Sequence, residues 1–159
     1  MIDIGGGDSR LVDHLIDRGV QCVTVLDISG AALKRAAERL PLAPVKWIEA
    51  DVTGEWTTPP VDLWHDRAVF HFLTQASERE RYVARLVRTL NPGGQAIIAT
   101  FAPDGPAKCS GLAVARYSGE TLALELSPRL RLVDTVRDEH RTPTGGVQAF
   151  SYNRFIREQ

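Results

Sequence analysis

Apolar positions recur along the chain with two different spacings, and the change between them separates predicted strands from predicted helices. Short apolar or alternating runs predict strands over residues 1–4, 21–27, 45–49, 61–65 and 95–101. Apolar positions at helical spacing predict helices over residues 9–18, 31–40 and 77–90. Ser77 and Glu80 stand at the start of the third helix with the spacing of a capping box.

The C-terminal part of the chain departs from this alternation. Asn91-Pro92-Gly93-Gly94 predicts a turn, and residues 102–117, rich in Gly and Pro, predict a loop. Ser118 caps a predicted helix that ends at residue 126, and two long β patterns over 130–141 and 147–157 flank the turn residues 142–146 as a hairpin. The pattern predicts a single domain over residues 1–159, with an α/β fold, a doubly wound, mostly parallel sheet and an antiparallel C-terminal hairpin strand.

The first predicted strand runs directly into three glycines, Gly5, Gly6 and Gly7, and a predicted helix follows them. A strand, a glycine turn and a helix together bring backbone N–H groups close to a ligand. A dinucleotide-binding turn would need a third glycine where the chain has Arg10, although Asp27 closes the next strand at the expected distance. In the other interpretation, this is a plain strand–helix turn whose glycines only permit tight packing.

Four stretches of the chain resemble class I S-adenosylmethionine (SAM) methyltransferases. The loop Asp3-x-Gly5-x-Gly7-x-Ser9 resembles their binding loop, with a serine in place of the third glycine. The turn Asn91-Pro92-Gly93-Gly94 and the closing hairpin are also similar, whereas a nicotinamide fold normally adds another parallel crossover there. Asp66-Arg67 is similar to the fourth motif of small-molecule and protein-lysine methyltransferases. The resemblance implies in-line transfer of a methyl group from SAM to an N, O or S nucleophile of a small molecule or protein side chain, leaving S-adenosyl-L-homocysteine (SAH).

The resemblance also implies where the cofactor binds. Asp27 would accept the ribose hydroxyls, Asp51 the adenine amino group, and the Val52 N–H would meet an adenine ring nitrogen. Asp51 has a second interpretation, as a loop carboxylate in an Asx-turn. A salt-bridged strand end is likewise the alternative for the pair Asp66-Arg67. The full set of expected cofactor-binding residues is Asp3, Gly5, Gly6, Gly7, Asp27, Ile28, Asp51, Val52, Asp66 and Arg67.

Methyl transfer requires mainly that nucleophile, methyl carbon and sulfur be held in line. Where a base is needed, His65, His71 and His140 are the candidates, because imidazole titrates near neutral pH. The scattered histidines and Cys109 do not have the spacing of a metal site, so no metal is expected. The loop 102–117 and the hairpin positions His140, Arg141 and Gln148 are expected beside the methyl acceptor.

The composition of the chain argues against nucleic acid and membranes as its partners. The chain is 43% hydrophobic and 25% charged with a net charge of −1, which argues against a surface built to bind nucleic acid. No apolar run approaches the roughly 18 residues of a membrane span, and no signal peptide is visible. With only two cysteines and no CxxC spacing, the chain is expected to be cytoplasmic and reduced.

Two further functional classes stay open on the sequence: a non-catalytic SAM-binding or interaction module that keeps the fold, and a nucleotide-dependent oxidoreductase. The first predicted strand begins at Met1, whereas members of the methyltransferase family usually carry a preceding helix that covers the methionine end of SAM. We therefore expect that a truncated chain would expose an apolar patch near the glycine loop and bind SAM weakly.

Overall fold

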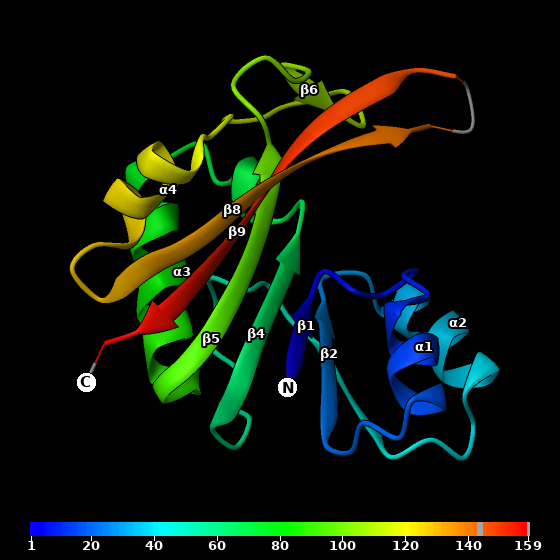
Figure 1. Cartoon of the computed structure of the whole chain (residues 1–159). Helices are drawn as coiled ribbons and strands as arrows, with labels where there is room; N and C mark the ends of the chain where they lie inside the picture. The colour runs from blue at the N-terminus through cyan, green and yellow to red at the C-terminus, as the bar shows by residue number, and fades with distance from the viewer. Residues whose placement is uncertain (143–144, 159) are drawn as a thin grey trace.

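The computed structural model describes residues 1–142 and 145–158, and its centre is one seven-stranded sheet in the order β3-β2-β1-β4-β5-β9-β8 (Figure 1). The strands of this sheet are β1 (Ile2–Ile4), β2 (Val23–Asp27), β3 (Val45–Glu49), β4 (Val61–Arg67), β5 (Leu90–Phe101), β8 (Leu130–Arg141) and β9 (Val147–Arg157). The helices are α1 (Leu11–Asp17), α2 (Gly30–Arg39), the 3₁₀ turn η1 (Phe70–Phe72), α3 (Ala76–Thr89) and α4 (Gly119–Leu126).

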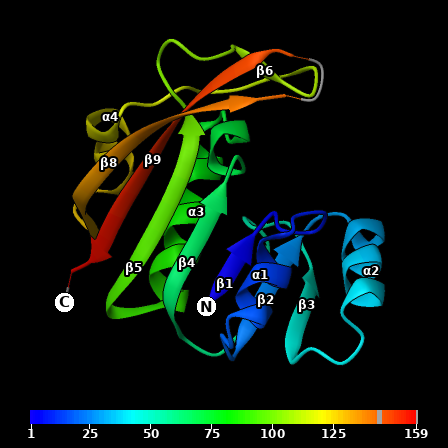
Figure 2. The ribbon, with the colours of Figure 1, turned by 45° about the vertical axis from the view of Figure 1, so that its right-hand side comes forward.

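The sheet is doubly wound, as the sequence predicts. Strands β1 to β5 run parallel, so their carboxyl ends gather at one edge, at the top of Figure 2. Strand β9 is antiparallel to both β5 and β8, which confirms the antiparallel strand of the terminal hairpin. The strand order reverses between β1 and β4, and in such folds a ligand binds where the order reverses.

Two apolar clusters lie on opposite faces of the sheet. Ile2, Ile4 and Trp64 pack with residues of α3 and α4, and α3 lies behind β4 and β5 in Figure 1. Val23 and Val25 pack on the other face, where side chains of α1 and α2 complete the cluster. Because side chains alternate along a strand, the residues between these apolar positions point to the opposite face.

The start of α3 differs from the prediction. Gln75, not Ser77, is the N-cap residue, and its backbone N–H donates to Glu78 Oε2 over 3.0 Å, so the predicted capping box of Ser77 and Glu80 is wrong. The 3₁₀ turn η1 comes shortly before Gln75, whose backbone is extended (φ −90°, ψ 138°), so the helix begins there. A polar side chain with Glu three positions later occurs twice in this stretch, and the sequence pattern does not separate the two.

Two predicted loops contain strand structure. Leu90 pairs with Val61 and Gln95 with Leu63, so the predicted turn 91–94 is an irregularity inside the ladder of β4 and β5. The predicted loop 102–117 contains a small hairpin of β6 (Lys108–Cys109) and β7 (Leu112–Ala113). Ser110 (φ 49°) and Gly111 (φ 83°) make its two-residue turn, because such turns need left-handed backbone.

The terminal hairpin extends past the rest of the sheet in Figure 1. Its predicted turn covers residues 142–146, of which 143 and 144 lie outside the described residues; Thr142 N donates to Gly146 O over 2.8 Å. Within the described chain, none of the helices has the length and apolar character to cross a membrane.

Candidate functional site

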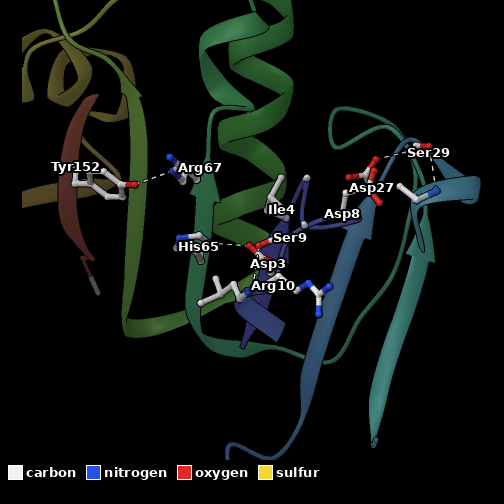
Figure 3. A pocket seen from close by; sticks show the side chains of 14 residues that line it. Asp3, Ile4, Asp8, Ser9, Arg10, Asp27, Ser29, His65, Arg67 and Tyr152 are labelled. Carbon is white, nitrogen blue, oxygen red and sulfur yellow. Dashed lines mark hydrogen bonds and ion pairs between the residues drawn. The ribbon is translucent and has the colours of Figure 1, made fainter. Parts of the chain in front are cut away.

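Two cavities meet at the carboxyl ends of the parallel strands. The first, of about 750 Å³, lies over the glycine loop (Figure 3). The second, of about 730 Å³, lies between the end of β2, residues 50–52 after β3, and η1. They share Ile4, Gly5, Asp27 and Arg67 in their walls. The two cavities therefore form one continuous groove, with Asp27 and Arg67 at its middle.

Close packing and backbone conformation explain the three glycines of the loop after β1, of which Gly5 and Gly6 line the groove. Gly5 has a left-handed backbone (φ +70°), and a Cβ at Gly6 would lie 2.2 Å from Asp3 Oδ2. At Gly7 a Cβ would lie 2.8 Å from the Cβ of Ala32 on α2. Any side chain at Gly6 or Gly7 would push the loop away from β1 or α2 and change the shape of the groove.

The glycine loop offers fewer free N–H groups than we expected. Gly5 N donates to Leu26 O over 2.7 Å, and Gly7 N donates to Asp27 Oδ2 over 2.9 Å. The Gly6 N–H is the one of the three without a partner among the described residues. The three glycines can therefore offer a ligand close backbone approach and the N–H of Gly6.

Asp27 connects the loop to helix α2. Its Oδ2 accepts from Gly7 N, and its Oδ1 accepts from Ser29 N over 2.8 Å. Each carboxylate oxygen can accept a second hydrogen bond. The carboxylate lines both cavities and is therefore fixed at the middle of the groove, with acceptor capacity left for two hydroxyl groups.

The second cavity has apolar walls and one carboxylate. Ile28, 73% exposed, and Val52, which is buried, line it together with Asp51. Asp51 Oδ1 accepts from the backbone N and the hydroxyl of Thr53, which is the Asx-turn interpretation of this residue. Oδ2 has no partner in the described chain, so the turn leaves one acceptor for a ligand amino group.

Asp3 and His65 form a pair at the other end of the groove. The residues are in register on the adjacent strands β1 and β4, and His65 Nδ1 lies 2.7 Å from Asp3 Oδ1 (Figure 3). Asp3 is 2% exposed, and its Oδ2 has no hydrogen-bond partner among the described residues. A buried carboxylate oxygen without a donor is an acceptor suited to a cation or an ordered water.

The structure does not bring Asp66 to the groove. Its carboxylate is fully buried on the opposite face and accepts from Tyr82 Oη over 2.6 Å and from Val69 N over 2.9 Å. Phe70 N and, through Tyr82, the indole N–H of Trp64 complete this network. Burial raises the pKa of Asp66 to about 6. Asp66 thus fixes the turn after β4, and its placement gives no support to the expected cofactor contact.

Arg67, the next residue, points to the groove and lines both cavities. Its Nε donates to Tyr152 Oη over 2.8 Å, and its guanidinium carbon lies 4.9 Å from the centre of the Phe150 ring. Sequence reasoning missed Tyr152 in the wall of the groove. The pairings Arg67 to Ala99 and Ala99 to Tyr152 place the two side chains in one row across β5, and the register of a distant strand is not visible in the sequence.

Of the three candidate histidines, only His65 lies in the groove. His71 is fully buried, its Nδ1 accepts from Phe101 N over 3.4 Å, and burial lowers its pKa to about 4. His140 stands opposite Gln148 in the hairpin and lines neither cavity, as is also true of Arg141. A group of three or more His, Cys, Asp or Glu side chains that could hold a metal ion is not found within the described ranges.

Comparison with known proteins places the chain in a family. Residues 1–94 match the family model described as a methyltransferase domain. An uncharacterized methyltransferase of Mycobacterium tuberculosis is 31% identical over 102 residues, covering 64% of this chain and 50% of the relative. The trans-aconitate 2-methyltransferase of Rhizobium etli is 34% identical over 115 residues, covering 71% and 42%. The chain thus spans about half the length of the curated relatives it matches.

Solved structures share the fold over almost the whole chain. The N-methyltransferase NodS of Bradyrhizobium japonicum superposes with a TM-score of 0.77 at 20% identity, covering 99% of this chain and 85% of NodS. The 1,6-didemethyltoxoflavin-N1-methyltransferase of Burkholderia thailandensis, solved with bound 1,6-didemethyltoxoflavin and SAH, superposes with a TM-score of 0.78 at 21% identity, covering 99% of this chain and 70% of that enzyme. The chain therefore belongs to the methyltransferase domain family and has the class I, seven-stranded Rossmann-like fold of SAM-dependent methyltransferases.

Proposed function

We propose that this chain binds SAM along the groove and transfers its methyl group to an N, O or S nucleophile of a small molecule or a protein side chain. One observation carries the proposal: a single groove places carboxylates at both ends and in the middle, from Asp3 through Asp27 to Asp51. SAM has hydrogen-bond donors at its two ends and in its middle as well: the ammonium at one end, the ribose hydroxyls in the middle and the adenine amino group at the other end.

The adenosine half fits the second cavity. Ile28 and Val52 provide apolar surface for a planar ring, and Asp51 Oδ2 supplies an acceptor for its amino group. Asp27 has acceptor capacity for the two ribose hydroxyls. These residues are among those that the family resemblance implies for the cofactor.

The methionine half fits the first cavity. The buried Oδ2 of Asp3 lacks a donor within the described residues, and an ammonium group, directly or through water, would supply one. The N–H of Gly6 and the guanidinium of Arg10 both lie in this part of the groove and would favour a carboxylate. Opposite charges are therefore available for both ends of a zwitterion.

When bound, SAM supplies a methyl group on a sulfonium, which a nucleophile attacks as the carbon–sulfur bond breaks. The chain contributes alignment, because the groove fixes the cofactor from both ends. His65 is the candidate base, for acceptors that must lose a proton. In the tautomer whose Nδ1–H donates to Asp3 Oδ1, Nε2 of His65 carries no proton and can accept one.

The names of relatives leave the nucleophile open. Those at 29% to 34% identity include enzymes named as acting on trans-aconitate and on malonyl-[acyl-carrier protein], the second as an O-methyltransferase. NodS and the toxoflavin enzyme are N-methyltransferases. We therefore propose the reaction class without choosing among N, O and S.

A thermal-shift panel tests the proposal. SAM and SAH should raise the melting temperature, while NAD and NADP should not, because only a ligand that binds the folded state stabilises it. Asp27→Ala should weaken SAM binding by about ten- to hundredfold. Asp17→Ala, an exposed position on α1 outside both cavities, is the matched control. Stabilisation by NAD alone would favour an oxidoreductase, and SAM binding without turnover on any acceptor would favour a non-catalytic SAM-binding module.

A further inference from the structure

We infer that Arg67 binds a carboxylate of the methyl acceptor, so that the substrate is a small carboxylic acid. The inference rests on the proposed function and deepens it. The sequence assigned Arg67 to the cofactor; its fixed geometry, its lack of an acidic partner and its place in the groove point to the acceptor instead.

The guanidinium of Arg67 is held in place by two neighbours. Nε donates to Tyr152 Oη over 2.8 Å, and the ring of Phe150 lies under the guanidinium at 4.9 Å (Figure 3 shows the Tyr152 contact). Ala99 stands between Arg67 and Tyr152 in the register of the sheet, and its small side chain lets the two longer ones meet. Since Nε is occupied, the two Nη groups remain for a ligand.

Of the two arginines that line the groove, Arg10 and Arg67, Arg67 is the one without a carboxylate partner among the described residues. Arg10 Nη1 lies 3.7 Å from Asp13 Oδ1, and Asp8 forms an ion pair with Arg35 through two hydrogen bonds. Asp27 accepts from backbone N–H groups. In the described part of the chain Arg67 forms no ion pair, and its contacts are a phenol and an aromatic ring.

The position of Arg67 makes a contact with the sulfonium of the cofactor unfavourable. It lies in the wall shared by the two cavities, next to the middle of the groove. With adenosine in one cavity and methionine in the other, the sulfonium falls near this shared wall. Two positive charges close together repel, so the arginine does not serve the sulfonium. An anion brought by the acceptor would be attracted by both.

A carboxylate matches the available donors. The planar guanidinium presents its two Nη groups in a fork that fits two carboxylate oxygens. A carboxylate paired with the guanidinium has its negative charge stabilised and is a weaker nucleophile, so Arg67 orients the acceptor, and the atom that is methylated lies elsewhere in the same molecule. Arg67 is thus a substrate-binding residue.

The test compares acids with their amides on the chain saturated with SAH. Benzoate, succinate and glutarate are titrated by calorimetry beside benzamide, succinamide and glutaramide. At least one acid should bind about tenfold or more tightly than its amide. Arg67→Gln should abolish this preference and leave SAH affinity within about twofold, and Arg67→Lys should keep part of it. Arg81→Gln, an exposed position on α3 outside both cavities, makes the same change in net charge and should keep the preference in full.

The variant Tyr152→Phe tests how much the fixed position of the Arg67 guanidinium contributes to acid binding, apart from its charge. The guanidinium stays but loses its oxygen acceptor, so the acid should bind about threefold to tenfold more weakly with unchanged SAH affinity. If no acid binds better than its amide, or if Arg67→Gln weakens SAH and acid by the same factor, the inference is wrong while the proposed function stands. A wild-type chain that does not bind SAH would instead refute the proposed function.

Discussion

Two buried groups outside the groove, Asp66 and His71, should give the stability of this protein an unusual pH dependence. Burial raises the pKa of Asp66 from 3.8 to about 6, and burial lowers the pKa of His71 from 6.5 to about 4. Both side chains are fully buried. In each case the folded protein favours the neutral form. The neutral form of Asp66 carries the titrating proton, whereas the neutral form of His71 has lost it.

The signs follow from which state binds more protons. For Asp66 the folded state binds more, so its contribution is complete below pH 3.8 and is lost as the pH rises to about 6. For His71 the unfolded state binds more, so its contribution is complete above pH 6.5 and is lost as the pH falls to about 4. Each difference corresponds to about 3 kcal/mol, at about 1.4 kcal/mol for a tenfold change in proton affinity.

In the wild type the two contributions oppose one another between pH 4 and 6, and single variants should separate them. Asp66→Asn removes the first, so on acidification from pH 6.5 to 4 its free energy of unfolding should fall by about 2 kcal/mol more than that of the wild type. His71→Gln removes the second, so its free energy of unfolding should rise relative to the wild type over the same range by about 2.5 kcal/mol.

Urea unfolding at half-unit pH steps measures these differences. The exposed, arginine-paired carboxylates Asp8 and Asp104, whose pKa values are lowered by Arg35 and Arg137, act equally in all three proteins and cancel in the comparison. A constant loss of stability from the substitution itself also cancels, because only the change with pH is compared. If the wild-type and Asp66→Asn curves run parallel, Asp66 has an ordinary pKa and the account of its burial is wrong.

Three further substitutions test other parts of the structure. Gly7→Ala places a Cβ 2.8 Å from Ala32 and 2.9 Å from Asp27 Oδ2, so SAM affinity measured by calorimetry should fall by about tenfold or more; unchanged affinity would mean that the loop adapts. Asp51→Ala should weaken SAM binding by about tenfold while the melting temperature of the ligand-free protein stays nearly constant, and an effect on the melting temperature alone would leave Asp51 as a turn residue. Tyr82→Phe removes the hydroxyl donor to Asp66, so urea unfolding should show a loss of about 1–3 kcal/mol, and a neutral result would contradict the buried network.

The sequence predicts much of the fold and the location of Asp27 and Asp51 because both depend on local features. Asp27 ends a predicted strand and Asp51 follows one, and the ends of parallel strands gather at one edge, which is where the structure has these residues. Asp66 shows the limit of reading a motif as one unit. Alternation along β4 puts it on the face of Trp64, toward the helices, while His65 and Arg67 point to the groove.

Features that depend on contacts distant in sequence could not be predicted. Tyr152 meets Arg67 only because β9 pairs with β5 in one particular register, and shifting that register by one residue would turn Tyr152 to the other face. The cap at Gln75 was missed for a local reason, since Ser77 and Glu80 satisfy the same pattern two residues later.

A structure of the chain with SAH bound tests the central claim most directly. The account predicts that the adenine lies between Ile28 and Val52 with its amino group on Asp51, that the ribose hydroxyls donate to Asp27, and that the methionine end lies beside Asp3 in the first cavity. Adenine in the first cavity, or SAH bound outside the groove, would contradict it.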